Sequence, residues 1–170
     1  AGGSHIIWGG MGGLGLLTAR VLVHACAARS LVLASRSGQV QRGSEEDFEA
    51  LKSFKGRPVS LRQLRTSASE VSEVKRLHTL TLAQRVYGVV HSAGVQSDAL
   101  LTKAMASHFA NAFGPKTHAA IHMQQALAHA GHAYLAVYAS AGGLFGIRGG
   151  SPYSAQVSDS VCEPCGWHVG

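Results

Sequence analysis

The sequence has few cysteines, a shortage of acidic residues and no long apolar run. Three cysteines occur in 170 residues, and Cys162 and Cys165 form a single CxxC near the end. One CxxC without a second pair is a weak indication of a zinc or redox site, so we interpret it as two thiols in a poorly structured tail. No apolar run reaches the roughly 20 residues that a bilayer-spanning helix needs. The glycine-rich residues 9–15 interrupt the first apolar stretch and no basic segment precedes it, which argues against a signal peptide. We therefore expect a soluble cytoplasmic chain without a membrane partner.

Charge and histidine content exclude two further classes of function. Fifteen basic residues against nine acidic ones give a net charge of +6. The lysines and arginines are scattered and are not interleaved with aromatic residues, so a nucleic-acid partner is not expected. Among ten histidines, His118 and His122 are four residues apart on one predicted helix, but no HExxH motif or positioned carboxylate accompanies them. We predict solvated helix histidines and no metal site.

Strand-like and helix-like segments alternate along most of the chain. The length fits one domain with a real core, and the 46% hydrophobic content argues against disorder. Short apolar segments typical of strands lie at 5–8, 30–35, 87–94 and 133–140, and the weak alternation of 57–64 indicates a further strand. Helical spacing of apolar residues predicts helices at 14–28, 69–80, 98–113 and 116–130. The polar and charged segment 39–56 indicates a loop with a short surface helix at 45–52. This alternation predicts an α/β fold, namely a Rossmann-like, doubly wound parallel sheet in a three-layer αβα arrangement.

The stretch GGMGGLG lies directly between the first predicted strand and the first predicted helix. Glycines at 9, 13 and 15 allow a tight turn, a close approach of the backbone to a pyrophosphate, and close packing of the helix on the strand. The start of the helix offers N–H groups and the positive end of its dipole to an anion. We therefore predict a nucleotide-binding loop, and a tight turn without a ligand is the alternative.

The end of the second predicted strand indicates which nucleotide is bound. An NAD site places a carboxylate about 20 residues beyond the glycines, where it holds the ribose hydroxyls. Here the strand ends in Ser35, Arg36 and Ser37. A guanidinium can pair with the 2′-phosphate of NADP through two parallel hydrogen bonds. The prediction is an NADP(H) site, and a solvated loop arginine is the alternative.

Five motifs together resemble the ketoreductase domain of type I polyketide synthases. GGMGGLG, LVLASRSG, HSAGV, PKTHAA and SAGG…PY occur in the order and spacing of that family, over residues 5 to about 156. Animal-type fatty acid synthases have a related domain, and both belong to the short-chain dehydrogenase/reductase superfamily. The resemblance implies NADPH-dependent reduction of a β-ketoacyl thioester, carried on the phosphopantetheine arm of an acyl carrier protein. It also implies the other domains of a polyketide or fatty acid synthase as partners.

The resemblance implies a catalytic set as well. In ordinary short-chain reductases a lysine follows the tyrosine by four residues, but position 157 of this chain is valine. Polyketide ketoreductases resemble a rearranged version, in which a PK motif after the fourth strand supplies the lysine. Pro115-Lys116 matches that motif, and Ser140 precedes Tyr153 by thirteen residues, as in the family. The implied catalytic residues are Ser140, Tyr153 and Lys116.

These three residue types suit the reduction of a ketone. A free phenol, with a pKa near ~10, donates its proton slowly at neutral pH. A nearby ammonium stabilises the phenolate and brings the acid closer to the working pH. A serine hydroxyl can donate a hydrogen bond to the carbonyl oxygen as negative charge develops on it. The nicotinamide would supply the hydride.

The same resemblance implies which residues hold the cofactor. They come from the glycine-rich loop, from the end of the second predicted strand, and from the HSAG motif after the fourth. They are Gly9, Gly10, Gly12, Gly13, Leu14, Gly15, Ser35, Arg36, Ser37, His91, Ala93 and Gly94.

The chain departs from the family at several positions. Val157 stands where the family has an asparagine that helps to hold the lysine or a water, and Trp8 stands where the family usually has a threonine. Nothing around residues 65–68 matches the family's aspartate, which is expected near the adenine. Beyond residue 157 a divergent segment replaces the family's helix and last strands. We therefore expect an incomplete ketoreductase domain at 1–157, without its C-terminal strands, and an unstructured tail at 158–170.

These departures favour an alternative function. The chain would then be a non-catalytic ketoreductase remnant with a structural role that still binds NADP(H). A general short-chain dehydrogenase acting on free small molecules is a third possibility, which the absence of YxxxK disfavours.

Overall fold

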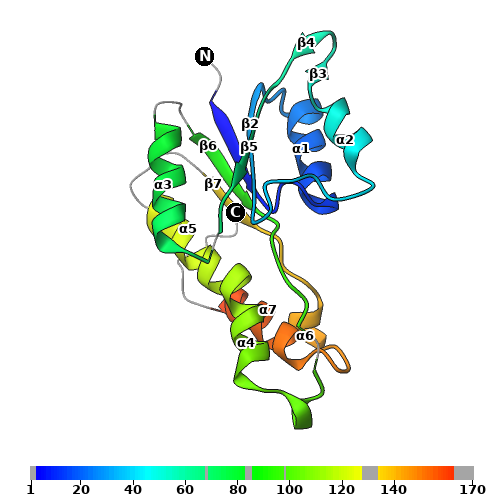
Figure 1. Cartoon of the computed structure of the whole chain (residues 1–170), viewed down its shortest axis with the longest axis vertical. Coiled ribbons are helices and arrows are strands. Elements are labelled where there is room, and N and C mark those ends of the chain that lie inside the picture. Colours follow the sequence, from blue (N-terminus) through cyan, green and yellow to red (C-terminus); the bar gives the residue numbers. More distant parts are fainter. Residues whose placement is uncertain (1–2, 68, 83–85, 98, 128–133, 163–170) are drawn as a thin grey trace. The chain divides into compact units, whose positions relative to one another are not determined.

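The computed structural model describes residues 3–67, 69–82, 86–97, 99–127 and 134–162. The chain packs as two compact units (Figure 1). The first unit is formed by Ala1–Ala93 and Ala119–Tyr138, and the second by Gly94–His118 and Ala139–Gly170. No helix within the described ranges is long and apolar enough to cross a bilayer.

A five-stranded parallel sheet forms the centre of the first unit (Figure 1). Its spatial order is β5 (Ser60–Arg65), β2 (Ser30–Ser35), β1 (Ser4–Trp8), β6 (Val86–His91) and β7 (Tyr134–Val137). The chain moves outward from β1 through β2 to β5 and then returns to β6 on the other side of β1. The direction of winding therefore reverses between β1 and β6, which is where open α/β sheets bind ligands. The Rossmann-like, doubly wound fold predicted from the sequence is confirmed.

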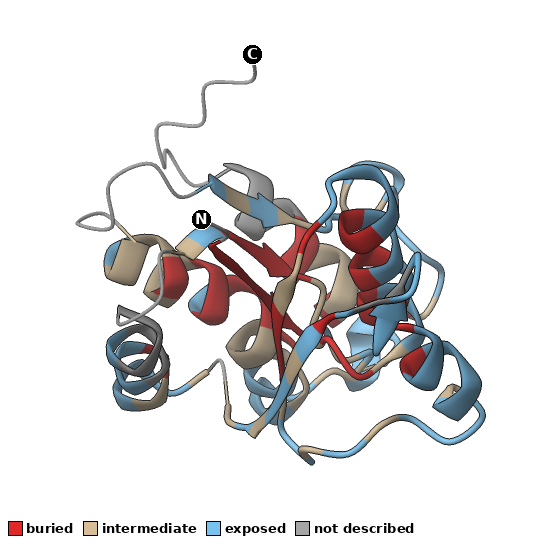
Figure 2. Ribbon diagram, turned by 90° about the horizontal axis from the view of Figure 1, so that it is seen from above, coloured by how far each residue is buried: buried red, intermediate tan, exposed pale blue. Residues whose placement is uncertain are grey.

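Alternating side chains of the strands build an apolar core on each face of this sheet, and the central strands β1, β2 and β6 hold its most buried residues (Figure 2). On one face Ile7 and Leu33 pack against α1 (Gly13–Ala25), together with Phe48 of α2 (Glu45–Ala50). On the other face lie α3 (Val71–Leu82) and α5 (Ala119–Leu127), which contribute Val74 and Met123. The two faces follow from the period of two in a strand, which sends neighbouring residues to opposite sides.

Trp8 belongs to the second of these cores. It is 3% exposed and lines a small apolar cavity with Ile6, Val89 and Met123, among others. Strand alternation directs residue 8 to the α3–α5 face, whereas the glycine-rich loop packs at Gly10 against Leu33 on the α1 face. The indole therefore fills core space and does not enter the glycine-rich loop.

Several element boundaries differ from those predicted. α1 ends at Ala25 rather than at residue 28, because Ala27 adopts a left-handed conformation (φ 52°) that turns the chain. A hairpin of β3 (Ser53–Phe54) and β4 (Arg57–Pro58) lies where a loop and the start of a strand were expected. Both residues of its turn, Lys55 and Gly56, have positive φ, as a two-residue hairpin turn requires.

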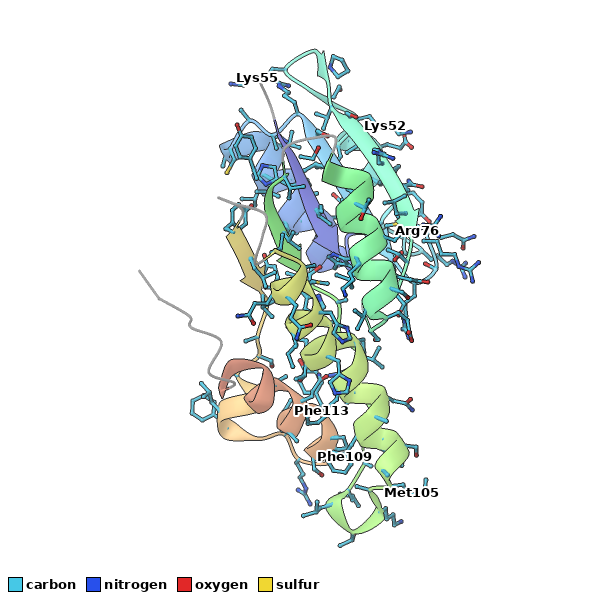
Figure 3. The ribbon with its side chains drawn as sticks, turned by 90° about the vertical axis from the view of Figure 1, so that its left-hand side faces the viewer. Lys52, Lys55, Arg76, Met105, Phe109 and Phe113 are labelled. Carbon is cyan, nitrogen blue, oxygen red and sulfur yellow. The ribbon has the colours of Figure 1, made fainter. Side chains whose placement is uncertain are left out.

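The second unit is helical. It contains η1 (Leu101–Lys103), α4 (Ala106–Phe113), the π-helical turn η2 (Gly114–His118), α6 (Gly142–Phe145) and α7 (Ser151–Cys162). Phe109 and Phe113 lie one turn apart on α4, and Met105 is its N-cap residue (Figure 3). The wide η2 turn coincides with Pro115, which lacks the N–H that an α-helical hydrogen bond needs.

Helix α7 continues past the predicted domain boundary at residue 157. Residues 158–162 are helical, which differs from the unstructured tail expected there. The segment SDSVC contains no glycine or proline, so nothing in it stops a helix that has already started. Residues 163–170, which include Cys165, lie outside the described residues, so the interpretation of the CxxC stays a prediction.

Candidate active site

Three glycines of the GGMGGLG loop are required by close backbone packing. Gly9 has φ +78°, and a Cβ on it would lie 2.6 Å from the backbone nitrogen of Ala93. A Cβ on Gly10 would lie 2.6 Å from the carbonyl oxygen of Ile7, and one on Gly15 would collide with the backbone of Gly9 and Gly10. These positions serve the turn after β1 and the close approach of α1 to that turn.

Gly12 and Gly13 are different, because their surroundings are open. A Cβ on Gly13 would meet no atom within 4 Å, and the nearest atom to one on Gly12 would be the side-chain oxygen of Gln41, at 3.4 Å. Gly12 is the N-cap of α1 and therefore has no side chain to cap the helix. The Gly13 N–H donates a long hydrogen bond, 3.4 Å, to Gln41 Oε1. A neutral amide oxygen thus occupies a position that suits a phosphate oxygen, so this loop fits the pyrophosphate of a dinucleotide.

The turn after β2 leaves Arg36 facing solvent. Ser35 Oγ accepts a hydrogen bond from the Gly38 N–H at 3.1 Å, and Ser37 Oγ accepts one from the Gln39 N–H at 3.2 Å. The two serines therefore shape the turn, while the Arg36 side chain is exposed. An exposed guanidinium at the carboxyl end of a strand is available to an anionic ligand.

The HSAG motif closes the other side of the loop after β1. His91 is fully buried at the end of β6, and its carbonyl oxygen accepts a hydrogen bond from the Tyr138 N–H at 3.0 Å. The N–H and the hydroxyl of Ser92 both donate to the carbonyl oxygen of Trp8, at 2.8 Å each. Ala93 then packs on Gly9 as described above. These contacts hold the ends of β1 and β6 together at the point where the winding reverses.

Two further residues sit beside this loop. Leu14, in the first turn of α1, is 44% exposed. One turn later Thr18 donates a hydrogen bond to the Leu14 carbonyl oxygen at 2.8 Å, and its Oγ1 lies 2.9 Å from the Tyr138 hydroxyl. Because the Thr18 proton is already used, Tyr138 is the donor in the second bond. No motif in the sequence pointed to Tyr138 or to Gln41.

The three predicted catalytic residues all lie in the second unit, as does Gly94. Lys116 is on η2 and only 6% exposed, and a Cβ on Gly94 would lie 3.9 Å from its Cδ. Burial lowers the pKa of the Lys116 ammonium below its ordinary value of 10.5. Lysine side chains are seldom buried, so the position of Lys116 makes it a candidate functional residue.

Tyr153 comes from α7, which packs with η2, and Ser140 comes from the segment before α6, which packs on α7. Tyr153 is in the first turn of α7, and the Thr117 hydroxyl of η2 donates to the Gln156 carbonyl oxygen of α7 at 3.0 Å. Ser140 directly precedes the turn into α6, which packs on α7. Its Oγ accepts a hydrogen bond from the Gly142 N–H at 3.2 Å. The structure therefore brings the three carrying elements into one compact unit.

The neighbourhood of position 157 holds a residue that the sequence did not reveal. Val157 is 1% exposed, and Gln156 beside it is fully buried. In the described part of the chain neither Nε2 nor Oε1 of Gln156 has a hydrogen-bond partner. No group of three or more metal-ligating side chains occurs among the described residues.

Comparison with known proteins identifies the family. The model of the KR domain matches residues 3–163. The chain belongs to the KR domain family. KR domains are the ketoreductase domains of polyketide synthases, within the short-chain dehydrogenase/reductase superfamily, so the family predicted from the five motifs is confirmed.

Two similar curated proteins are large synthases. The chain is 30% identical over 157 residues to naringenin synthase of Pestalotiopsis fici. It is 32% identical over 154 residues to the spectinabilin polyketide synthase system protein NorB of Streptomyces orinoci. These matches cover 90% of this chain but only 6% and 7% of the relatives, so the KR chain spans less than a tenth of their length.

Solved structures give the same result. The first ketoreductase of the tylosin polyketide synthase has a TM-score of 0.78 and 28% sequence identity, over 94% of this chain and 34% of that one. An A-type ketoreductase from a modular polyketide synthase has a TM-score of 0.78 and 27% identity, over 92% of this chain and 33% of that one. Levodione reductase, at a TM-score of 0.76 and 22% identity over 93% of this chain and 62% of that one, shares the fold.

Proposed function

We propose that this chain reduces a β-ketoacyl thioester on an acyl carrier protein to the β-hydroxyacyl form with NADPH, within polyketide or fatty acid biosynthesis. The observation that carries this proposal is the buried Lys116, on a turn that packs against the helix of Tyr153. Folding seldom buries a lysine ammonium, whereas proton transfer from a tyrosine to a ketone is assisted by a nearby ammonium that stabilises the phenolate.

The first unit supplies the residues for the cofactor. The open backbone at Gly12 and Gly13, at the start of α1, suits the pyrophosphate. Arg36 suits the 2′-phosphate that distinguishes NADPH from NADH. When bound, NADPH would supply a hydride to the carbonyl carbon of the substrate.

The second unit supplies the residues for the substrate oxygen. The Tyr153 hydroxyl gives its proton to the carbonyl oxygen, and the Lys116 ammonium stabilises the phenolate that remains. Burial strengthens this stabilisation because the surroundings of Lys116 screen charge less than water does. Ser140 accepts from the Gly142 N–H, which fixes its oxygen and leaves its own proton for the carbonyl oxygen.

The partners in this proposal are an acyl carrier protein and the other domains of a synthase. The similar curated proteins are synthases, of which this chain spans a small part. A net charge of +6 suits docking of an acidic carrier domain.

Val157 favours a second candidate, a KR remnant that binds NADP(H) without catalysis. Its buried side chain cannot form the hydrogen bonds of the asparagine expected at that position. This candidate predicts cofactor binding without turnover.

One experiment separates the two candidates. The purified chain is mixed with NADPH and the N-acetylcysteamine thioester of a β-keto acid, and loss of NADPH absorbance is followed, while NADPH fluorescence reports binding. We expect turnover that falls about 10²- to 10⁴-fold in Tyr153→Phe, with binding unchanged. Tyr87→Phe, at the amino end of β6, is the matched control and keeps full activity. Binding without turnover in the unaltered chain would support the remnant, and absence of binding would contradict both candidates.

A further inference from the structure

We infer that Arg65, at the carboxyl end of β5, is a second guanidinium for the 2′-phosphate of NADP(H), acting together with Arg36. This inference rests on the proposed function and adds a specificity-determining residue to it. It concerns the first unit alone.

Strand register brings the two arginines together. β2 and β5 are parallel, with Ser35 opposite Arg65, and the Thr66 N–H donates to the Ser35 carbonyl oxygen at 2.9 Å. Arg36 follows Ser35 directly. Arg36, the first residue beyond β2, is thus one position past the residue that pairs with Arg65, on strands separated by about 5 Å.

The turn after β2 packs on Arg65 itself. Gly38 has φ +69°, and a Cβ on it would lie 2.9 Å from Arg65 Cβ and 3.4 Å from its Cα. Ser35, through the bond from the Gly38 N–H, folds the turn back onto the end of β5. The turn after β2, which carries Arg36 and Gly38, therefore forms one surface with Arg65.

Arg65 lies on the same face of the sheet as the glycine-rich loop. Leu61 packs with the core beneath α1, and alternation along β5 places residues 61, 63 and 65 on that face. Arg62 is on the opposite face. Arg36 and Arg65 are both exposed, so neither guanidinium is buried in the core.

The local balance of charge favours an anionic ligand. The carboxylate near Arg65 is Glu73, which accepts hydrogen bonds from the Ser67 N–H and, at 3.0 Å, from the Thr66 hydroxyl. These bonds, with a contribution from Arg76 and Arg65, hold the pKa of Glu73 below its ordinary value. Arg76 lies on α3 (Figure 3). Within the described ranges, ion pairs are formed by Arg20 with Asp47 and by Lys52 with Glu49, and neither includes Arg36 or Arg65.

A positive charge at this position changes what the pocket accepts. A carboxylate at the end of β5 would repel a 2′-phosphate dianion, whereas a guanidinium attracts it and can bind two of its oxygens. Two guanidinium groups on one dianion leave less uncompensated charge than one. The expected consequence is a stronger preference for the 2′-phosphorylated nucleotide.

The test uses the full chain and nucleotide fragments, so it does not depend on catalysis. Isothermal titration measures Kd for adenosine 2′,5′-bisphosphate and for adenosine 5′-monophosphate at low and moderate salt. Arg65→Gln is expected to weaken the bisphosphate about tenfold, to leave the monophosphate unchanged, and to reduce the salt dependence of the bisphosphate Kd. Arg65→Lys, which keeps the charge without the fork, is expected to lose about two- to fivefold. Arg62→Gln, on the same strand, is the matched control and changes neither Kd.

Three other results of these titrations would each contradict a different part of the proposal. If Arg36→Gln weakens the bisphosphate while both Arg65 variants bind like the unaltered chain, the role of Arg65 is wrong and the proposed NADP preference stands. If Arg65→Gln weakens both nucleotides equally, the residue is structural. If the unaltered chain binds the two nucleotides equally, or neither, the NADP preference is wrong and the inference falls with it. Circular dichroism confirms folding of each variant, and Arg65→Lys decides the matter if Arg65→Gln does not fold.

Discussion

Replacing Lys116 by methionine should raise stability while abolishing catalysis. Lys116 is 6% exposed, and the Cδ of its aliphatic stem lies 3.9 Å from where a Cβ on Gly94 would be. Methionine keeps the packing of that stem and removes the desolvated ammonium. Burial penalises the charged form of Lys116, as the direction of its pKa shift shows. We therefore expect the free energy of unfolding to rise by about 1–3 kcal/mol at pH 7, while turnover falls at least about 10²-fold.

The gain should depend on pH in a defined direction. Burial lowers the pKa of Lys116 from 10.5, so between the folded-state pKa and 10.5 the unfolded chain holds a proton that the folded chain has released. The stability of the unaltered chain therefore rises with pH in that window. Below the folded-state pKa the advantage of Lys116→Met is complete and constant, and above 10.5 it has disappeared.

Urea denaturation followed by circular dichroism measures both quantities, provided the slope with urea is the same in the two chains. Lys103→Met, at an exposed lysine in the same unit, is the control and should change stability by less than about 0.5 kcal/mol. A loss of more than about 1 kcal/mol in Lys116→Met would show that the ammonium stabilises the fold. The burial of Lys116 would then no longer argue for catalysis.

Four further substitutions test the packing within each unit by urea denaturation. Gln156→Met removes two buried amide atoms that have no hydrogen-bond partner in the described part of the chain. The substitution should raise the free energy of unfolding by about 1–3 kcal/mol. A loss of stability would mean that the Gln156 amide forms hydrogen bonds in the folded chain. Gly15→Ala forces a Cβ into backbone atoms and should lower the free energy of unfolding by about 1–3 kcal/mol. The Cβ of Gly13→Ala meets open space, so this variant should raise the free energy of unfolding by up to about 1 kcal/mol and weaken NADPH binding. Equal effects of the two substitutions would contradict the division of roles among the glycines. Trp8→Thr, which gives the family's usual residue at this position, should lower the free energy of unfolding by about 3–5 kcal/mol because the indole fills the core between the sheet and α3 and α5. An unchanged free energy of unfolding would contradict that core position.

Much of the fold was predictable because its signals are local. The apolar segment 30–35 coincides with β2, since a strand buried on both faces must be apolar throughout. The glycine-rich stretch between a strand and a helix predicted the turn after β1, and the structure shows a steric reason at Gly9, Gly10 and Gly15. Lys116 was found only through the PK motif, because its burial depends on contacts between η2 and α7.

What the sequence missed depends on contacts between distant segments. The contact between Gly38 and Arg65 joins residues 27 positions apart, and the composition of neither segment predicts it. The burial of Gln156 likewise follows from the packing of α7 and not from its own polarity, which predicts exposure. The β3–β4 hairpin was missed because its turn places the non-glycine Lys55 at positive φ, which that residue type seldom adopts.

Transfer of a labelled hydride tests the central claim most directly. NADPH carrying deuterium at carbon 4 of the nicotinamide is incubated with the unaltered chain and a β-ketoacyl thioester, and the product is examined by mass spectrometry. The proposal predicts a β-hydroxyacyl product with one deuterium on the former carbonyl carbon, from only one of the two stereospecifically labelled cofactors. Unreduced thioester in the presence of bound NADPH would contradict catalysis by Tyr153 and Lys116 in this chain.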